Sequence, residues 1–181
     1  MKKIIAVVIL FLFVLGACKE EEDPKYAQFN YYIKMQPSVQ FDTLLFNVTQ
    51  VGYDNHGDQS GWFLPTSKSA IFDLGKESQL FLGTFKKAGL LNNTNRWPDP
   101  LPFRHFLSTK NHWIVDSSKY TELSLIKNRG PETSEFITAM NVNEGDVVDV
   151  VFNLDVDKSV RLDSAGGNWI KWVGEVEMVK K

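Results

Sequence analysis

The sequence has little of several residue types on which common kinds of chemistry depend. A single cysteine, Cys18, stands among 181 residues, so the chain can form neither an internal disulfide nor a metal site built from several thiolates. The three histidines, His56, His105 and His112, belong to no zinc, nucleophile-elbow, P-loop or dinucleotide signature. We therefore expect a protein that is not an enzyme and that uses neither a metal nor a cofactor.

An excess of one sign of charge is also missing. The chain has 20 Lys and Arg against 22 Asp and Glu, and loss of Lys2 and Lys3 with an N-terminal signal would leave 18 against 22. A nucleic-acid partner requires a basic surface, so none is expected. After the first residues no apolar run approaches the roughly 20 residues that span a bilayer.

The N-terminal segment has the order of charges and apolar residues typical of a secretory signal. Lys2 and Lys3 precede the apolar run 4–14, and small residues lead to Cys18. This arrangement resembles the lipobox of bacterial lipoproteins, which implies cleavage after residues 1–17 and acylation of Cys18, with outer-membrane lipid as the anchor. The alternative is an ordinary secreted protein with a cysteine at this place, or a short membrane anchor.

Residues 18–27 are read as a lipidated cysteine and an acidic tether. Lys19 is followed by four acidic residues in "KEEED". The stretch resembles the export signal that sends Bacteroidetes-type lipoproteins to the outside of the outer membrane, which implies a location facing the cell surface. An acidic block without apolar residues is also what a solvated, disordered tether looks like, and a periplasm-facing domain stays open as the alternative.

Residues 28–181 form one domain of alternating apolar and polar residues. Period-two alternation predicts strands packed on one face, and turn signals separate the runs. We expect a mainly β, antiparallel β-sandwich with at most one or two short helices. The strand runs lie at 29–35, 44–49, 148–157 and 170–178, the turns at 54–61, 143–146 and 163–167, a hairpin at 135–156, and one short helix at 77–88.

The Pro-rich stretch 92–106 is predicted to be a long loop or an edge, because its three prolines remove backbone donors. An exposed tryptophan in such a loop suits stacking on a sugar ring. Three further tryptophans, Trp62, Trp113 and Trp172, are expected in the core. An equally open reading is that the loop tryptophan folds back on a sheet edge. The candidate ligand-binding residues are Trp97, Asp99, Arg104, His105 and Trp169.

Two weaker patterns concern metal binding and covalent modification. Calcium takes 6–8 oxygen ligands, and two acidic clusters could supply some of them, but turn chemistry and solvated strand faces are the preferred explanation of these clusters. The "DSA" stretch resembles an Asp-Ser/Thr-apolar acceptor of O-glycosylation and places Ser164 in a turn. The acidic clusters are Asp54, Asn55 and Asp58, and Asp155, Asp157 and Asp163.

Several short motifs follow one another along the chain: Val48 and Val51 before Trp62, Asp73-Leu74, Ala88-Gly89, the stretch 154–160 and the final apolar run 172–179. Their order resembles an uncharacterised family of Bacteroidetes-type lipoproteins with an immunoglobulin- or prealbumin-like sandwich. The resemblance implies the fold and the location, and it implies no activity.

Two functions follow from these patterns. The first is a non-enzymatic, lipid-anchored surface domain that binds a ligand such as glycan. The second is a structural or interaction subunit of a surface complex that binds a surface protein through an edge strand, for which 29–35 is the predicted edge.

Overall fold

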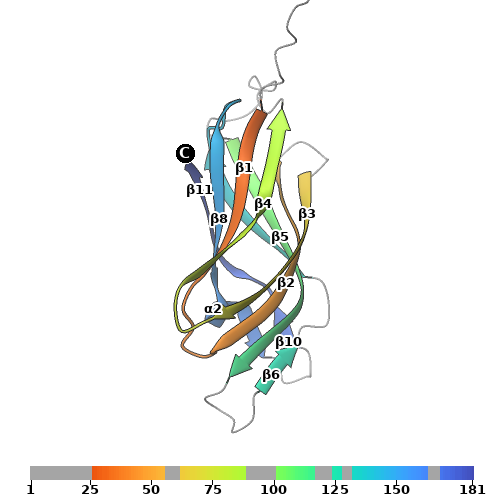
Figure 1. Ribbon diagram of the computed structural model, residues 1–181, viewed down its shortest axis with the longest axis vertical. Coiled ribbons are helices and arrows are strands. Elements are labelled where there is room, and N and C mark those ends of the chain that lie inside the picture. Colours follow the sequence, from red (N-terminus) through yellow and green to blue (C-terminus); the bar gives the residue numbers. More distant parts are fainter. Residues whose placement is uncertain (1–25, 56–61, 89–100, 117–123, 128–131, 163–167) are drawn as a thin grey trace, which may run out of the picture.

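The computed structural model describes residues 26–55, 62–88, 101–116, 124–127, 132–162 and 168–181, and these form two large sheets that pack face to face (Figure 1). One sheet has four strands and the other five, and a small pair, β9–β10, stands apart. This arrangement confirms the predicted β-sandwich. The part of the chain that the structure describes contains one helix, of four residues, and no helix there is long and apolar enough to cross a membrane.

The four-stranded sheet, called sheet A, places the first strand in its interior. Strand β1 lies between β8 and β4, and it runs parallel to β8 although the other pairs are antiparallel. The prediction that 29–35 forms an edge is therefore wrong, because the pairing of β1 with β8 joins segments more than 100 residues apart. In order across the sheet the strands are β11 (Val173–Lys180), β8 (Val147–Asp155), β1 (Tyr26–Met35) and β4 (Ser78–Ala88).

The five-stranded sheet, called sheet B, is organised around its longest strand. The first part of β5 pairs with β7 and the last part with β6, while β2 lies along its other side. The strands are β3 (Trp62–Asp73), β2 (Thr43–Asn55), β5 (Leu101–Asp116), β6 (Ser124–Lys127) and β7 (Glu132–Met140). The remaining elements are α2 (Val156–Ser159), β9 (Val160–Leu162) and β10 (Asn168–Ile170).

The predicted helix at 77–88 is wrong, because this segment is strand β4. Its pairing with β1 shifts between Tyr31 and Tyr32, so that Leu82 is an extra residue between the partners Phe81 and Gly83. Such a bulge changes the phase of the alternation. Phe81 therefore faces solvent, although Phe85, four residues later, faces inward. In the sequence, a spacing of four between two aromatic residues is typical of one face of a helix, and this spacing led to the wrong prediction.

The predicted hairpin at 135–156 is also wrong. The "NEGD" turn does connect β7 with β8, but the two strands belong to different sheets: β7 pairs with β5, and β8 pairs with β1 and β11. The turn therefore carries the chain from one layer of the sandwich to the other. Of their partners, only β1 lies far away in the sequence, more than 100 residues before β8.

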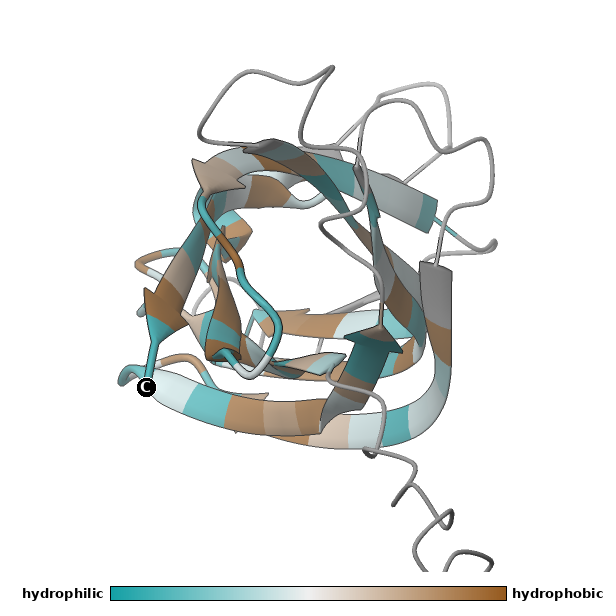
Figure 2. Cartoon of the chain, turned by 90° about the horizontal axis from the view of Figure 1, so that it is seen from above, coloured by the Kyte–Doolittle hydropathy of each residue, from teal (hydrophilic) through white to brown (hydrophobic). Residues whose placement is uncertain are grey.

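The core lies between the two sheets and is rich in aromatic rings. On β1 the alternate residues Phe29, Tyr31, Ile33 and Met35 are fully buried, as the alternation predicted, and brown and teal residues alternate along the strands in Figure 2. Trp172 is also buried, at 3% exposure, which confirms its core position. Trp113 is half-buried, and the side chain of Trp62 lies outside the described residues.

A bulge in β5 bends this long strand. Two residues, Asn111 and His112, stand opposite Phe46, because the pairing with β2 shifts between Leu45 and Asn47. Asn111 has a φ of 59°, a left-handed conformation that asparagine tolerates better than most residues. The bend lies between the part of β5 that pairs with β7 and the part that pairs with β6.

We expect Asn111→Val to lower the free energy of unfolding by about 1–2 kcal/mol, because a β-branched residue is strained at positive φ. Asn111→Gly should leave it unchanged or raise it. Urea unfolding measures both. Lys110→Val, at the neighbouring exposed position, is the control for added apolar surface, and an equal loss in both valine variants would contradict a role of the backbone conformation.

Candidate functional site

The structure tests only part of the predicted ligand site. Trp97, Asp99 and the predicted glycosylation site Ser164 lie outside the described residues, as does Cys18. Trp169 lies in β10, but its side chain is not among those described. The predicted loop 92–106 is a strand from Leu101 onward. Pro102 lies near the start of that strand, a position where a missing backbone donor is tolerated.

Arg104 lies on the outer face of sheet B, where carboxylates already engage it. Its Nη2 donates to Asp54 Oδ2 at 2.6 Å, and its Nη1 is 3.9 Å from Glu135. The hydrogen bond to Asp54 is the main reason why the pKa of Arg104 is raised. The guanidinium also lies 5.0 Å from the ring centre of Phe106. Two acids thus compensate the charge of Arg104, which leaves no net positive charge for an anionic ligand.

His105 cannot supply a contact to a ligand at the surface, which corrects the prediction for this residue. Its side chain is fully buried, because it alternates inward with Phe103 and Leu107 on β5. Desolvation lowers its pKa to about 3, so the ring is neutral near pH 7. Its neighbours are aromatic: the ring centres of Tyr31 and Phe152 lie 6.2 and 6.4 Å away.

A second buried histidine takes part in a polar network between the sheets. His112 Nε2 lies 2.7 Å from Thr109 Oγ1, and Trp172 Nε1 donates to the same hydroxyl at 2.9 Å. The backbone N–H of Trp172 donates to Ser134 Oγ at 3.0 Å. Desolvation lowers the pKa of His112 to about 4. This network fixes the position of Trp172 and has a structural role.

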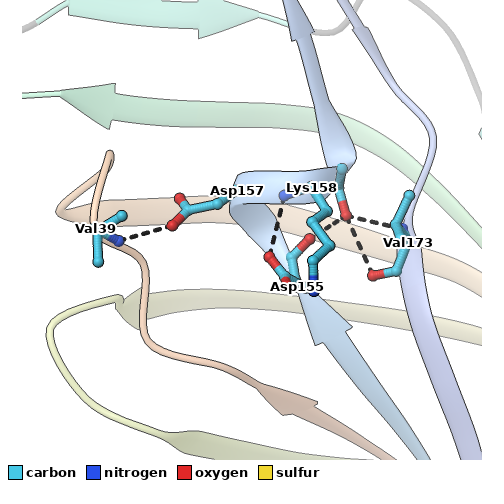
Figure 3. A network of polar contacts seen from close by, with 6 residues as sticks. Val39, Asp155, Asp157, Lys158 and Val173 are labelled. Atoms are coloured by element: carbon cyan, nitrogen blue, oxygen red, sulfur yellow. Dashed lines mark hydrogen bonds and ion pairs between the residues drawn. The ribbon is translucent and has the colours of Figure 1, made fainter.

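The acidic clusters considered for calcium form other contacts. Asp54 is paired with Arg104. Figure 3 shows that Asp155 accepts from Lys158 N at 3.0 Å and so caps α2, while Asp157 accepts from Val39 N at 2.8 Å. Within the described ranges no group of three or more acidic, histidine or cysteine side chains could hold a metal ion. Asp58, Asp163 and the side chain of Asn55 lie outside the described residues.

The solvent face of sheet A carries an arrangement that the sequence predictions missed. Its middle is a row of side chains that crosses all four strands in register, and we call this row the central strip. Phe81 is 45% exposed, and its ring centre lies 5.2 Å from that of Tyr32. Tyr32 and Val151 are half-buried. The strip consists of Phe81, Tyr32, Val151 and Glu177.

Polar side chains lie along both sides of the central strip. The first flanking row consists of Thr84, Asn30 and Asp149 and ends at the apolar Val179, which is 42% exposed; the second consists of Gln79, Lys34, Asn153 and Glu175. Each row crosses the same four strands. The face therefore offers three apolar side chains side by side, with amides and carboxylates on either side of them.

The first flanking row is ordered by hydrogen bonds within it. Asn30 Nδ2 donates to Asp149 Oδ1 at 3.0 Å, and Thr84 Oγ1 donates to Asn30 Oδ1 at 2.9 Å. Lys181 Nζ lies 2.7 Å from Asp149 Oδ2, and this contact is the main reason why the pKa of Lys181 is raised. These contacts hold the polar side chains of this row in fixed positions.

Part of this face could have been found from the sequence. The alternation in 29–35 already places Asn30, Tyr32 and Lys34 on the polar side of the strand, opposite the apolar residues. Phe81 was missed because the bulge in β4 made its segment look helical. Without Phe81, Tyr32 is a single aromatic residue on a polar face, and that alone does not indicate a binding site.

Comparisons with models of known protein families, with curated proteins and with solved structures give no match. The class of the protein is therefore assigned from its own fold. It is a mainly β sandwich of two packed sheets, with a row of aromatic and polar side chains across the solvent face of sheet A.

Proposed function

We propose that the protein is a non-enzymatic binding domain, anchored by lipid at Cys18 to the outer membrane and facing the cell surface, and that its ligand is a glycan. The order of residues 1–23 supports the anchor and the location. The central strip on sheet A supports the glycan. It takes the place of the Trp97 segment as the leading candidate site, because its side chains lie in register across four strands.

The observation that carries this proposal is the aromatic pair formed by the exposed Phe81 and the half-buried Tyr32, with polar side chains on either side. A sugar ring has an apolar face, which suits an aromatic side chain, and an edge of hydroxyls, which suits amides and carboxylates. Asn30 and Asn153 lie on opposite sides of the strip, so both edges of a ring stacked on Tyr32 would meet an amide. Neighbouring strands are about 4.8 Å apart, so these groups are close enough to act together.

The test is binding of residues 19–181, which contain every described strand, to a broad glycan panel. We expect Phe81→Ala to weaken binding about tenfold, corresponding to about 1.4 kcal/mol, because the largest exposed apolar surface of the strip is lost. Ile71→Ala is the matched control. Ile71 is an exposed apolar residue on β3, 73% accessible, and its loss should leave the affinity unchanged.

A third variant, Trp97→Ala, separates the two candidate sites. Binding that survives Phe81→Ala and disappears in Trp97→Ala would move the site to the Pro-rich segment and contradict the strip. If no glycan binds a folded protein, the glycan proposal fails.

A protein partner is the second candidate function, and one observation favours it. Ile137 on β7 is 76% exposed, and among the described strands β7 pairs only with β5. An unpaired strand edge with an exposed apolar side chain can accept a strand from a partner. β7 therefore replaces β1 as the edge to test, and Ile137→Lys would abolish such binding without affecting the glycan panel.

A further inference from the structure

We propose that the ligand of the central strip is an oligosaccharide without anionic groups that lies across the strands of sheet A. This inference rests on the proposed function and adds the chemical class and the direction of the ligand. It is argued from the charges around the strip and from the register of its side chains.

The lysines on this face are already engaged. Lys34 Nζ lies 3.1 Å from Glu77 Oε2, and Lys181 Nζ lies 2.7 Å from Asp149 Oδ2. Lys86 Nζ donates to the Tyr26 hydroxyl at 2.9 Å and lies 4.5 Å from the centre of that ring. A carboxylate or sulfate on a sugar would have to compete with these contacts. The face therefore offers little attraction to an anionic glycan.

The acidic residues at one end of the strip also disfavour an anionic glycan. Glu177 ends the strip on β11, and within the described part of the chain it has no cation within ion-pair distance. Glu175 stands beside it on the same strand, in the second flanking row. Both side chains are exposed. Like charges at close range repel, whereas a carboxylate accepts hydrogen bonds from neutral hydroxyls well.

The direction of the ligand follows from the register. The apolar side chains Phe81, Tyr32 and Val151 belong to three neighbouring strands, so the apolar surface extends across the strands. Along each strand, in contrast, the next outward side chain on either side is polar, as with Asn30 and Lys34 around Tyr32. Three strand spacings make the strip about 14 Å long. A chain of several sugar rings laid along it would place its apolar faces on the strip and its hydroxyl edges on the two flanking rows.

The experiment compares three sets of oligosaccharides of two to six rings by calorimetry on residues 19–181. The sets are neutral cello-, manno- and N-acetylated chito-oligosaccharides, acidic oligogalacturonides, and de-acetylated chito-oligosaccharides, which carry amines. We expect neutral chains to bind about tenfold more tightly than acidic ones, which is about 1.4 kcal/mol. The affinity should rise with chain length and stop rising once the chain spans the strip.

A charge variant gives a second readout. Glu177→Lys should raise the affinity for oligogalacturonides about fivefold and change neutral binding little, since a new cation then faces the end of the strip. Glu132→Lys on β7 makes the same change of charge on sheet B and should have no effect.

The two proposals fail in different ways. If acidic chains bind more tightly than the neutral and amine-bearing ones and lose affinity in Phe81→Ala, the site stands but the exclusion of anionic ligands is wrong. If affinity does not depend on length beyond one ring, the direction across the strands is wrong. If none of the three sets binds, and the broad panel also shows no binding that depends on Phe81, the proposed function fails with the inference.

Discussion

Acidification from pH 7 to about 4.5 is expected to lower the free energy of unfolding by about 5 kcal/mol, which equals the entire stability of many domains. The cause is the buried pair of histidines. Their folded pKa values, about 3 for His105 and about 4 for His112, lie well below the value near 6.5 of an unfolded chain. Between those values the unfolded chain binds protons that the folded chain excludes, so stability falls as the pH falls.

The pH window separates this effect from that of the carboxylates. Each histidine contributes a slope of about 1.4 kcal/mol per pH unit below about 6.5. Asp73, Asp146 and Asp155 have pKa values lowered by hydrogen bonds. The stability that these acids contribute is present above their unfolded pKa of about 3.9 and is lost only below it. A loss that begins near pH 6.5 therefore belongs to the histidines.

His105→Phe tests this explanation by urea unfolding between pH 7 and pH 4.5. Phenylalanine fills a similar volume among aromatic neighbours and cannot titrate, so the slope should fall by half, from about 2.7 to about 1.4 kcal/mol per pH unit. Tyr31→Phe is the matched control, since burial raises the pKa of Tyr31 well above its usual value and its loss should leave the slope unchanged. An unaltered slope in His105→Phe would show that the acid sensitivity has another source.

Thr109→Val is expected to lower the free energy of unfolding by about 2–5 kcal/mol. The Thr109 hydroxyl accepts from Trp172 Nε1 and bonds to His112 Nε2, and all three side chains are buried. Valine keeps the shape of threonine and removes the oxygen, so two buried polar atoms lose their partner at about 1–3 kcal/mol each. Urea unfolding at pH 7 measures the loss.

Two variants give this prediction its controls. Thr109→Ser keeps the hydroxyl and removes one methyl group, so it should cost about 1 kcal/mol. Thr49→Val removes an exposed hydroxyl that donates to Ser108 O at 3.2 Å, and its effect should stay within about 0.5 kcal/mol. If the serine and valine variants at position 109 are equally destabilised, packing rather than hydrogen bonding explains the role of Thr109.

The sequence predicted the class of fold because burial of a sheet on one face leaves a direct trace in the alternation of residues. Val148, Val150, Phe152 and Leu154 were expected to point inward, and all are fully buried. The pairing of strands left no such trace. Whether β7 and β8 form a hairpin, and whether β1 is an edge or an interior strand, depends on contacts between distant segments, and those contacts follow from the packing of the whole domain.

The candidate site was harder to predict than the fold, for a physical reason. His105 follows a Pro-rich stretch and so looked like a loop residue, whereas the alternation Phe103, His105, Leu107 and Thr109 would have placed it inward once β5 was recognised as a strand. On sheet A, a one-residue bulge at Leu82 concealed the alternation of β4. Local irregularities of this kind set which side chain faces solvent, and period-two patterns assume that they are absent.

The interior position of β1 has a mechanical consequence. The chain enters the sandwich at Tyr26, and β1 pairs with β4 over all ten of its residues and with β8 over the eight residues from Gln28 to Met35. Traction applied through the N-terminus, with the rest of the domain held, acts along this strand. The hydrogen bonds lie across the strand direction, so the load shears many of them at once and does not open them one by one. If the proposed lipid anchor at Cys18 holds the domain, it therefore holds it through a strand that resists pulling.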